Sequence, residues 1–480
     1  MNHHHAILTG SALLLLTVAT FAGPAATPPP KLEPKSDQHG LVFADGLLTL
    51  DITERLRFEV RSNNRDFNNL VNEDNDDAWV INRFRFGIGL KPASWLKIYG
   101  QLQDTREWNS ERPNTPGIRG DEGDDNFDLR QGYVEFGNLK EFPLSLTVGR
   151  QVLNYGDSRL VADPQWTNFG RTFDAVKLRY EQKGFGSIDL FAARPVQIKQ
   201  DVFNDSDSAD NFFGAYASLD MLSFQTTDVY VLYRDKADVQ PDLDPTNKID
   251  PRGTFNGPAQ RITTIGTRWA SKKGALGPWD YGFEGAYQFG DLWAANRVGK
   301  ALDQKAFALH AHGGYTFDQA AWKPRVGLEY NYSTGDKNPA DGKSESFQTL
   351  FPSNFAPYGY MDEIAWRNMH NARLHLTAQP TKQLTVELSY HALWLADTND
   401  YWYRNGVSSV RTKTPTGADV RTVNASNFLG HEIDLAFTYK PNDWLTVFTG
   451  YSHFFAEDYL KDTGPSDDAD FAYIQAGVQF

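Results

Sequence analysis

Apolar and polar residues alternate along most of the chain from residue 48 onward. In the first such stretch Leu56 and Phe58 share one parity, while Arg55 and Arg57 share the other. A period of two predicts a β-strand with one apolar and one polar face. The stretches run for roughly 10 to 14 residues, longer than strands of soluble proteins, which is the length of a tilted strand that crosses a bilayer.

Eighteen stretches of this kind follow one another. The expected strands occupy residues 48–61, 79–91, 95–108, 127–137, 143–153, 171–183, 185–196, 211–222, 225–236, 260–271, 278–290, 302–318, 322–335, 365–380, 382–396, 426–440, 442–456 and 469–480. Short turns follow the even-numbered strands, and longer loops rich in Asp, Asn, Gly and Pro follow the odd-numbered ones. This pattern predicts an all-β fold, a transmembrane antiparallel β-barrel of about 18 strands, with short periplasmic turns and long extracellular loops.

Aromatic residues support a barrel in the outer membrane. The last expected strand alternates up to a terminal aromatic, Phe480, which resembles the signal by which bacterial barrels are recognised for assembly. Eight tryptophans lie near strand ends, where interfacial girdles would place them. They are Trp79, Trp95, Trp269, Trp279, Trp293, Trp322, Trp394 and Trp444.

The chain begins with an apolar run that ends near Ala22, followed by a proline-rich stretch. We expect a signal peptide over residues 1–22, a proline-rich periplasmic leader over residues 23–47, and the outer-membrane β-barrel over residues 48–480. A single membrane-anchoring helix is the alternative for the apolar run. No other segment approaches the roughly 18 apolar residues that a spanning helix needs.

Composition excludes several classes of function. The chain has no cysteine, which removes disulfides, thiolate metal sites and cysteine nucleophiles. Its net charge of −14 argues against a nucleic-acid partner. No GxSxG elbow occurs, and we predict no enzyme and no resident cofactor. An acidic loop around Asp205 could hold Ca²⁺ through alternating oxygen ligands, although a solvated loop explains the same residues.

The polar parity of a closed barrel lines its lumen. The basic residues expected there are Arg55, Arg57, Arg61, Arg83, Arg85, Lys97, Lys177, Arg179, Arg325 and Arg373. A guanidinium group stays charged and presents donors that fit a carboxylate, so an arginine-lined pore would select anions. The alternative is structural: acids of the same parity, such as Glu59, Glu284 and Glu329, could pair with these cations and stiffen the wall.

Sequence motifs connect the chain to a known family. The motifs are RQGYVEF at 130–136, GRQ at 149–151, YGDSRL at 155–160 and WTNFGRTFD at 166–174. On these motifs the chain resembles the alginate export family of Gram-negative outer-membrane barrels over about residues 48–200. The resemblance implies an electropositive constriction that passes a polyuronate outward, gated by one periplasmic and one extracellular loop. By motif it adds Arg150, Arg159, Arg171 and Asp174 to the substrate path, and the topology places the three arginines at or near the extracellular rim.

The expected function is therefore an outer-membrane channel that passes an alginate-like polyuronate to the cell exterior. The alternative is a general or anion-selective nutrient porin for small solutes, and an adhesin or structural barrel with a plugged lumen is a third class. The expected partners are the anionic polysaccharide, outer-membrane lipid, and periplasmic export or polymerase components.

Overall fold

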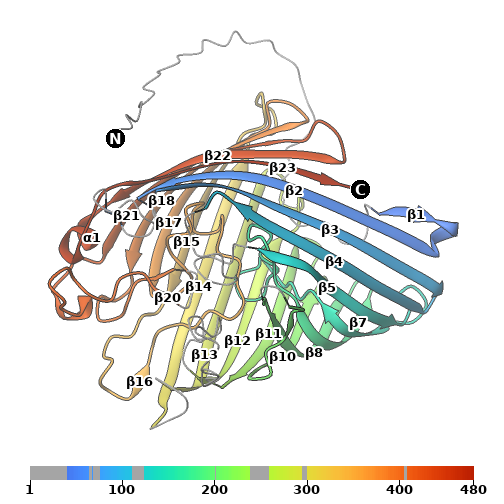
Figure 1. The fold of residues 1–480 in the computed structure, drawn as a ribbon, viewed down its shortest axis with the longest axis horizontal. Helices are drawn as coiled ribbons and strands as arrows, with labels where there is room; N and C mark the ends of the chain where they lie inside the picture. The colour runs from blue at the N-terminus through green and yellow to red at the C-terminus, as the bar shows by residue number, and fades with distance from the viewer. Residues whose placement is uncertain are drawn as a thin grey trace.

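The computed structural model is a closed antiparallel β-barrel (Figure 1). It describes residues 40–63, 67–68, 76–110, 124–199, 202–237, 259–293, 300–404 and 408–480. Each barrel strand pairs with its neighbours along the chain, and the first and last strands close the circle, with Arg57 opposite Gln475. The expected all-β class and the expected 18 barrel strands are confirmed.

The barrel strands are β2 (Leu48–Ser62), β3 (Asp77–Ala93), β4 (Leu96–Trp108), β5 (Asp125–Phe136), β6 (Leu144–Gln151), β7 (Phe173–Gln182), β8 (Gly186–Gln197), β10 (Asp210–Leu219), β11 (Gln225–Lys236), β12 (Gln260–Ser271), β13 (Trp279–Leu292), β14 (Leu302–Thr316), β15 (Arg325–Ser333), β17 (Met369–Ala378), β18 (Leu384–Leu395), β21 (Phe428–Tyr439), β22 (Leu445–Ala456) and β23 (Ala469–Gln479). Short elements accompany them: β1 (Leu41–Phe43), η1 (Ala44–Gly46), β9 (Asp205–Ser206), β16 (Lys343–Ser344), β19 (Tyr403–Arg404), β20 (Ser408–Ser409), η2 (Val420–Thr422) and α1 (Asp458–Thr463).

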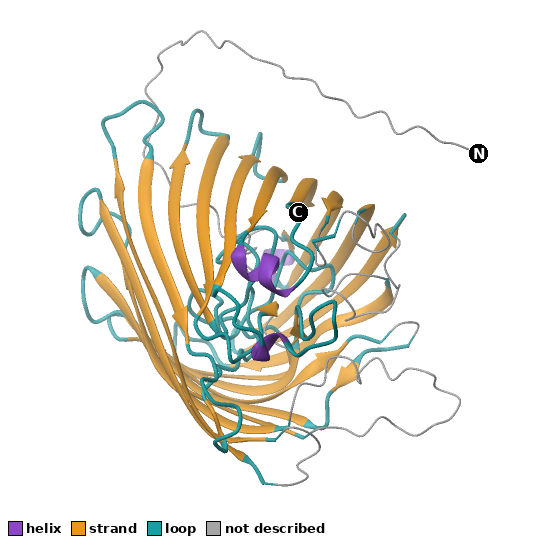
Figure 2. Ribbon diagram, turned by 90° about the vertical axis from the view of Figure 1, so that its left-hand side faces the viewer, coloured by secondary structure: helices purple, strands orange, loops and turns teal. Residues whose placement is uncertain are grey.

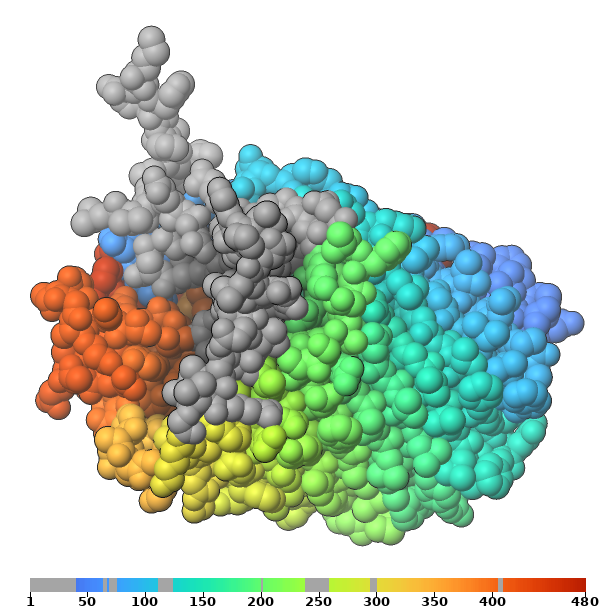
Figure 3. Space-filling model, turned by 60° about the horizontal axis from the view of Figure 1, so that its bottom comes forward, coloured from blue at the N-terminus to red at the C-terminus, as the bar shows by residue number. Residues whose placement is uncertain are grey.

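The two faces of each strand differ as the alternation predicts. On β2 the buried Arg55, Arg57 and Glu59 face the lumen, and the exposed Leu56 and Phe58 lie between them on the outer wall. The outer wall is a continuous surface from the strands coloured blue to those coloured orange (Figure 3). Apolar side chains on this outer surface suit lipid, and the polar parity is left for the interior.

The connections between strands are short on one rim and longer on the other, as expected. On the short-turn rim the longest connection, residues 317–324, has eight residues, and none of the residues in these turns is buried. None of these described turns therefore folds into the lumen. The periplasmic gating loop that the family resemblance implies is not found among them, because the turns are too short to reach inward.

Tryptophans mark the short-turn rim. Trp95, Trp279, Trp322 and Trp444 are exposed there, as a girdle at a membrane interface requires. Trp79 is the exception: it is 1% exposed and has the inward parity of β3, so its assignment to the girdle is wrong. Within the described part of the chain, no helix is long and apolar enough to cross a membrane.

The predicted signal peptide and most of the predicted leader lie outside the described residues. The end of the leader is described, and β1 within it pairs antiparallel with the start of β2, with Val42 opposite Thr49. The chain just before residue 48 is therefore attached to the barrel wall. Both the signal peptide and the leader stay predictions.

Candidate functional site

Two long-rim connections fold back into the barrel. We call residues 152–172, between β6 and β7, the first inner loop, and residues 345–368, before β17, the second inner loop. Loops occupy the middle of the barrel in the view along it (Figure 2). Phe169 of the first loop and Phe347 and Trp366 of the second are buried. The apolar core of this protein lies inside the barrel, where these loops meet inward-facing strand residues.

The two inner loops are joined to each other. Val161 and Phe351 form a parallel β-bridge, and the amide of Ala162 donates to the carbonyl oxygen of Phe351 at 2.8 Å. Trp166 stacks on Phe355 with ring centroids 3.7 Å apart. Backbone pairing and ring stacking together make one unit of the two loops.

Four arginines on β2 and β3 hold the first inner loop against the wall. We call Arg55, Arg57, Arg83 and Arg85 the arginine face. Each donates to a backbone carbonyl of the loop: Arg55 to Gln165 at 2.6 Å, Arg57 to Trp166 at 2.7 Å, Arg83 to Thr167 at 3.1 Å and Arg85 to Phe169 at 3.3 Å. The inward parity of two adjacent strands thus places four guanidinium groups on one side of the lumen.

The arginine face contains two cations without a direct ion-pair partner among the described residues. Among the described residues, neither Arg83 nor Arg85 forms an ion pair, and the acceptors of both are neutral amide and carbonyl oxygens. Arg57 and Arg61 differ, because both pair with Glu59, at 2.5 and 3.1 Å. An arginine held by neutral acceptors can exchange them for the carboxylate of an anion.

Asp163 anchors the first inner loop beside the arginine face. It pairs with Arg130 of β5 and accepts the amide N–H of Arg171 at 2.7 Å. Burial alone would raise the pKa of Asp163, but the charges of Arg130 and Arg85 hold that pKa below its usual value. Gly170 has φ +71°, and a Cβ there would lie 2.5 Å from Oδ1 of Asp163, so the turn requires glycine.

Arginines elsewhere on the wall pair with lumen acids, as the structural alternative predicted. Arg179 pairs with Asp189 at 2.7 Å, Arg325 with Asp280 at 2.5 Å, and Arg373 with Glu387 at 3.5 Å and Glu329 at 3.6 Å. The lumen is therefore divided: Arg83 and Arg85 of β3 are held by neutral acceptors, whereas Arg179, Arg325 and Arg373 form ion pairs on other strands.

The two predicted lysines belong to barrel strands and not to the inner loops. Lys97 of β4 has its ammonium group 5.8 Å from the ring centroids of Tyr99 and Tyr133. Lys177 is half-buried on the inward parity of β7, one position from Val176 on the exposed outer parity. Both residues keep the inward direction that the alternation predicts.

Arg150 and Asp174 do not face the lumen. They lie opposite each other on β6 and β7, joined by two hydrogen bonds of 2.8 and 3.1 Å. Arg150 shares its parity with the exposed Val148, so the pair lies on the outer face of the wall. The motif-based placement of this pair in the path is corrected, because strand parity directs both side chains outward.

Arg159 and Arg171 both contact other parts of the barrel interior. Arg159 is buried and pairs with Glu284 of β13 at 3.2 Å, and its Nη2 lies 2.8 Å from Nε2 of His310. Arg171 donates to the carbonyl oxygen of Pro352 in the second inner loop at 3.0 Å. The prediction that the three motif arginines gather at the extracellular rim is wrong for Arg159, because the loop that carries it turns into the barrel.

The acidic loop proposed for Ca²⁺ has other contacts. Asp205 pairs with Lys199 at 2.7 Å, and Asp210 pairs with Arg234 at 2.6 Å. No three His, Asp or Glu side chains of the described residues group closely enough to hold a metal ion. Calcium binding at Asp205 stays a prediction.

Sequence reasoning missed the loop side of the site. The loop has no strand alternation, so the pattern does not predict that Gln165 and Trp166 contact lumen arginines, and it marks Arg130 only as part of a motif. The signal that could have revealed the inner loops is composition: residues 346–366 and 160–173 are rich in Phe, Tyr and Trp, which exposed loops rarely carry.

Comparison with known proteins agrees with this architecture. The model of the alginate export family matches residues 47–473. No curated protein matches the sequence. Three solved barrels of Pseudomonas aeruginosa share the fold. OpdK, solved with vanillate, has a TM-score of 0.55 at 12% identity over 90% of this chain and 98% of its own. OccK9 (OpdG) has 0.57 at 11% over 90% and 98%, and OccD3 (OpdP) has 0.55 at 11% over 92% and 93%.

Proposed function

The chain belongs to the alginate export family, and from this membership and the arginine face we propose that it passes an alginate-like polyuronate to the cell exterior. It is an outer-membrane β-barrel of a Gram-negative bacterium, and its family and fold are those of a channel. The identity of the solute and the direction of transport are the parts we propose.

Arg83 and Arg85 carry the proposal. They are neighbours on the inward face of β3, and among the described residues they have no carboxylate partner. A carboxylate accepts stronger, charge-assisted hydrogen bonds from guanidinium than a neutral carbonyl does. A uronate unit that reaches the arginine face could therefore compete with the carbonyls of the first inner loop for the same donors.

This arrangement suits a moving chain of carboxylates. A conduit needs several weak sites, because one tight site would stop the polymer. The carbonyls of the first inner loop supply the competition that keeps each site weak. A polymer that exchanges with these carbonyls would pull the first inner loop away from the arginine face and separate it from the second inner loop as it enters.

The inner loops also support the second candidate, a porin for small anionic solutes. Their buried aromatic residues fill much of the barrel interior, so a polymer requires a rearrangement that a small carboxylate does not. OpdK, a barrel of the same fold, was solved with vanillate. The two candidates share the arginine face and differ in whether the inner loops must move.

A reversible disulfide between the two inner loops distinguishes the two candidate functions. Val161→Cys and Phe351→Cys place two thiols at the β-bridge between the inner loops, and the chain has no other cysteine. Bridge partners lie close enough for a disulfide. Passage of oligouronates and of small carboxylates would be measured across liposomes before and after reduction, so that the reduced protein is its own control.

Polymer export predicts that the oxidised protein stops oligouronates but still passes small carboxylates, and that reduction restores oligouronate passage. A barrel that excludes oligouronates in the reduced state too, yet passes small carboxylates in both states, would favour the porin. If neither class of anion passes in either state, both candidates fail.

A further inference from the structure

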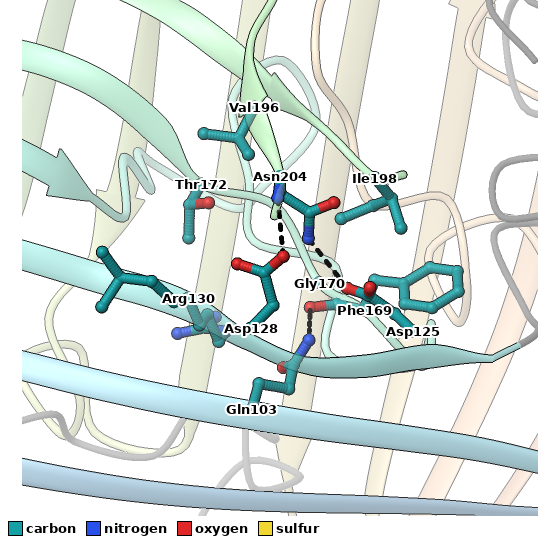
Figure 4. A pocket seen from close by; sticks show the side chains of 11 residues that line it. Gln103, Asp125, Asp128, Arg130, Phe169, Gly170, Thr172, Val196, Ile198 and Asn204 are labelled. Carbon is teal, nitrogen blue, oxygen red and sulfur yellow. Dashed lines mark hydrogen bonds between the residues drawn. The ribbon is translucent and has the colours of Figure 1, made fainter. Parts of the chain in front are cut away.

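A small cavity lies beside the first inner loop, at the long-rim end of β5 (Figure 4). Asp125 and Asp128 of β5 line it, together with Asn204 from the connection between β8 and β10. The cavity has room for a single water molecule or ion. Both aspartates are 2% exposed, so their carboxylates are almost completely removed from bulk solvent.

Asn204 orients both carboxylates. Its side-chain Nδ2 donates to Oδ2 of Asp125 at 2.8 Å, and its backbone amide donates to Oδ2 of Asp128 at 2.6 Å. The other oxygen of each carboxylate, Oδ1, is buried and has no hydrogen-bond partner among the described residues. One asparagine thus fixes two aspartates and leaves one unpartnered oxygen on each, beside the same cavity.

The charges of these aspartates are not balanced by ion pairs. Neither Asp125 nor Asp128 pairs with a Lys, Arg or His of the described residues, whereas most buried acids of this lumen do. Arg130 also lines the cavity, but its guanidinium group binds Asp163 and Gln101 instead. Two buried carboxylates without a counter-ion are costly, and binding a cation removes that cost.

We propose that this cavity binds a divalent cation, Ca²⁺, through the carboxylates of Asp125 and Asp128. Ca²⁺ prefers oxygen ligands, takes carboxylates together with neutral oxygens and water, and tolerates irregular geometry. The hydrogen bonds from Asn204 act as the outer contacts that hold ligating carboxylates in place. The bound ion would fasten the connection that carries Asn204 to β5.

This site is distinct from the acidic loop around Asp205. The Asp205 carboxylate is 62% exposed and already pairs with Lys199. The inference does not rest on the proposed function either, because it concerns cation binding by two aspartates of β5, whereas the proposed function concerns anion binding by Arg83 and Arg85. A buried water molecule or a proton shared by the two carboxylates is the competing occupant, and each predicts no calcium binding.

Isothermal titration of the full-length barrel in detergent tests the site. After removal of metal with EDTA, CaCl₂ is titrated into the wild type, Asp125→Asn, Asp128→Asn and the matched control Asp205→Asn. We expect one calcium site in the wild type and in Asp205→Asn, and at least a tenfold weaker affinity in each of the other two. A parallel thermal melt should show calcium raising the melting temperature only in the two proteins that bind it.

Asparagine keeps the shape of aspartate, and heat-modifiable migration on a gel verifies that each variant is a folded barrel. The wild-type titration decides the matter even if a variant does not fold. A wild type that binds no Ca²⁺ overturns the proposal, and so does binding that Asp205→Asn removes while Asp125→Asn and Asp128→Asn keep it.

Discussion

The guanidinium carbon of Arg57 lies 3.5 Å from the centroid of the Trp166 ring, and Nη1 of the same arginine donates to the Trp166 carbonyl oxygen at 2.7 Å. A residue of the barrel wall therefore holds both the side chain and the backbone of the first inner loop. Cation–π contacts of this kind are strongest where water is excluded. The contact therefore links a lumen cation, Arg57, to the position of the first inner loop.

Trp166→Ala should loosen the inner loops. The substitution removes the contact with Arg57 and the stack on Phe355, and truncation of a buried tryptophan typically costs about 3–5 kcal/mol. We expect a higher single-channel conductance and a lower melting temperature. Trp444→Ala, at the exposed short-turn rim, is the control and should leave conductance unchanged. Equal conductance in both variants would show that the loop does not restrict the lumen.

Glu284→Ala should destabilise the barrel strongly. It leaves the buried Arg159 without one of its carboxylate partners, and removing one member of a buried pair costs about 3–5 kcal/mol. Thermal melting checks the loss. Asp174→Asn breaks the outward pair with Arg150, where the carboxylate is 36% exposed, and should lower the melting temperature far less. Similar losses in the two variants would contradict the buried position of Arg159.

Acid should release the first inner loop. The folded-state pKa of Asp163 is lowered by Arg130 and Arg85 and therefore lies below the unfolded value of about 3.9. A depressed pKa stabilises the fold at pH values above the unfolded pKa, and this stabilisation is lost as the pH falls through the folded pKa. Conductance should rise as the pH is lowered from 5 towards about 3. Asp163→Asn should already show the higher conductance at neutral pH and respond little to acid over this range. An identical acid response in both proteins would exclude Asp163 as the group that titrates.

Arg150→Gln should leave ion selectivity unchanged. The side chain lies on the outer face of β6, bound to Asp174, so its charge does not border the lumen. Reversal potentials in a KCl gradient check this prediction. A clear fall in anion preference would mean that Arg150 reaches the path after all, as the sequence motif alone suggested.

The barrel wall could be predicted from sequence because it depends on local alternation. Each strand faces lipid on one side and the lumen on the other. Parity alone therefore assigns Arg55, Arg83 and Arg325 to the interior. The same rule places Arg150 outside, since it shares the parity of Val148. The family motif alone points to the substrate path at this position, and strand parity is the rule that the structure follows.

The inner loops could not be placed from local pattern. Their position depends on contacts between distant segments, such as the bridge between Val161 and Phe351 and the bonds from the arginine face to the first inner loop. Loop length suggested an extracellular position, and only the aromatic content pointed inward. The division of the lumen into an arginine face and ion-pair ladders likewise depends on which acids meet which cations across strands.

The central claim is that Arg83 and Arg85 draw anions through the lumen, and the reversal potential of the double variant Arg83→Glu and Arg85→Glu tests it most directly. In a planar bilayer with a KCl gradient, the wild type and Arg150→Gln should prefer chloride. The double variant should lose that preference by roughly tenfold or become cation-selective, because two cations of the lumen are replaced by two anions. Block of the current by oligouronates should disappear with it. An unchanged reversal potential and unchanged block in a folded double variant would contradict the account.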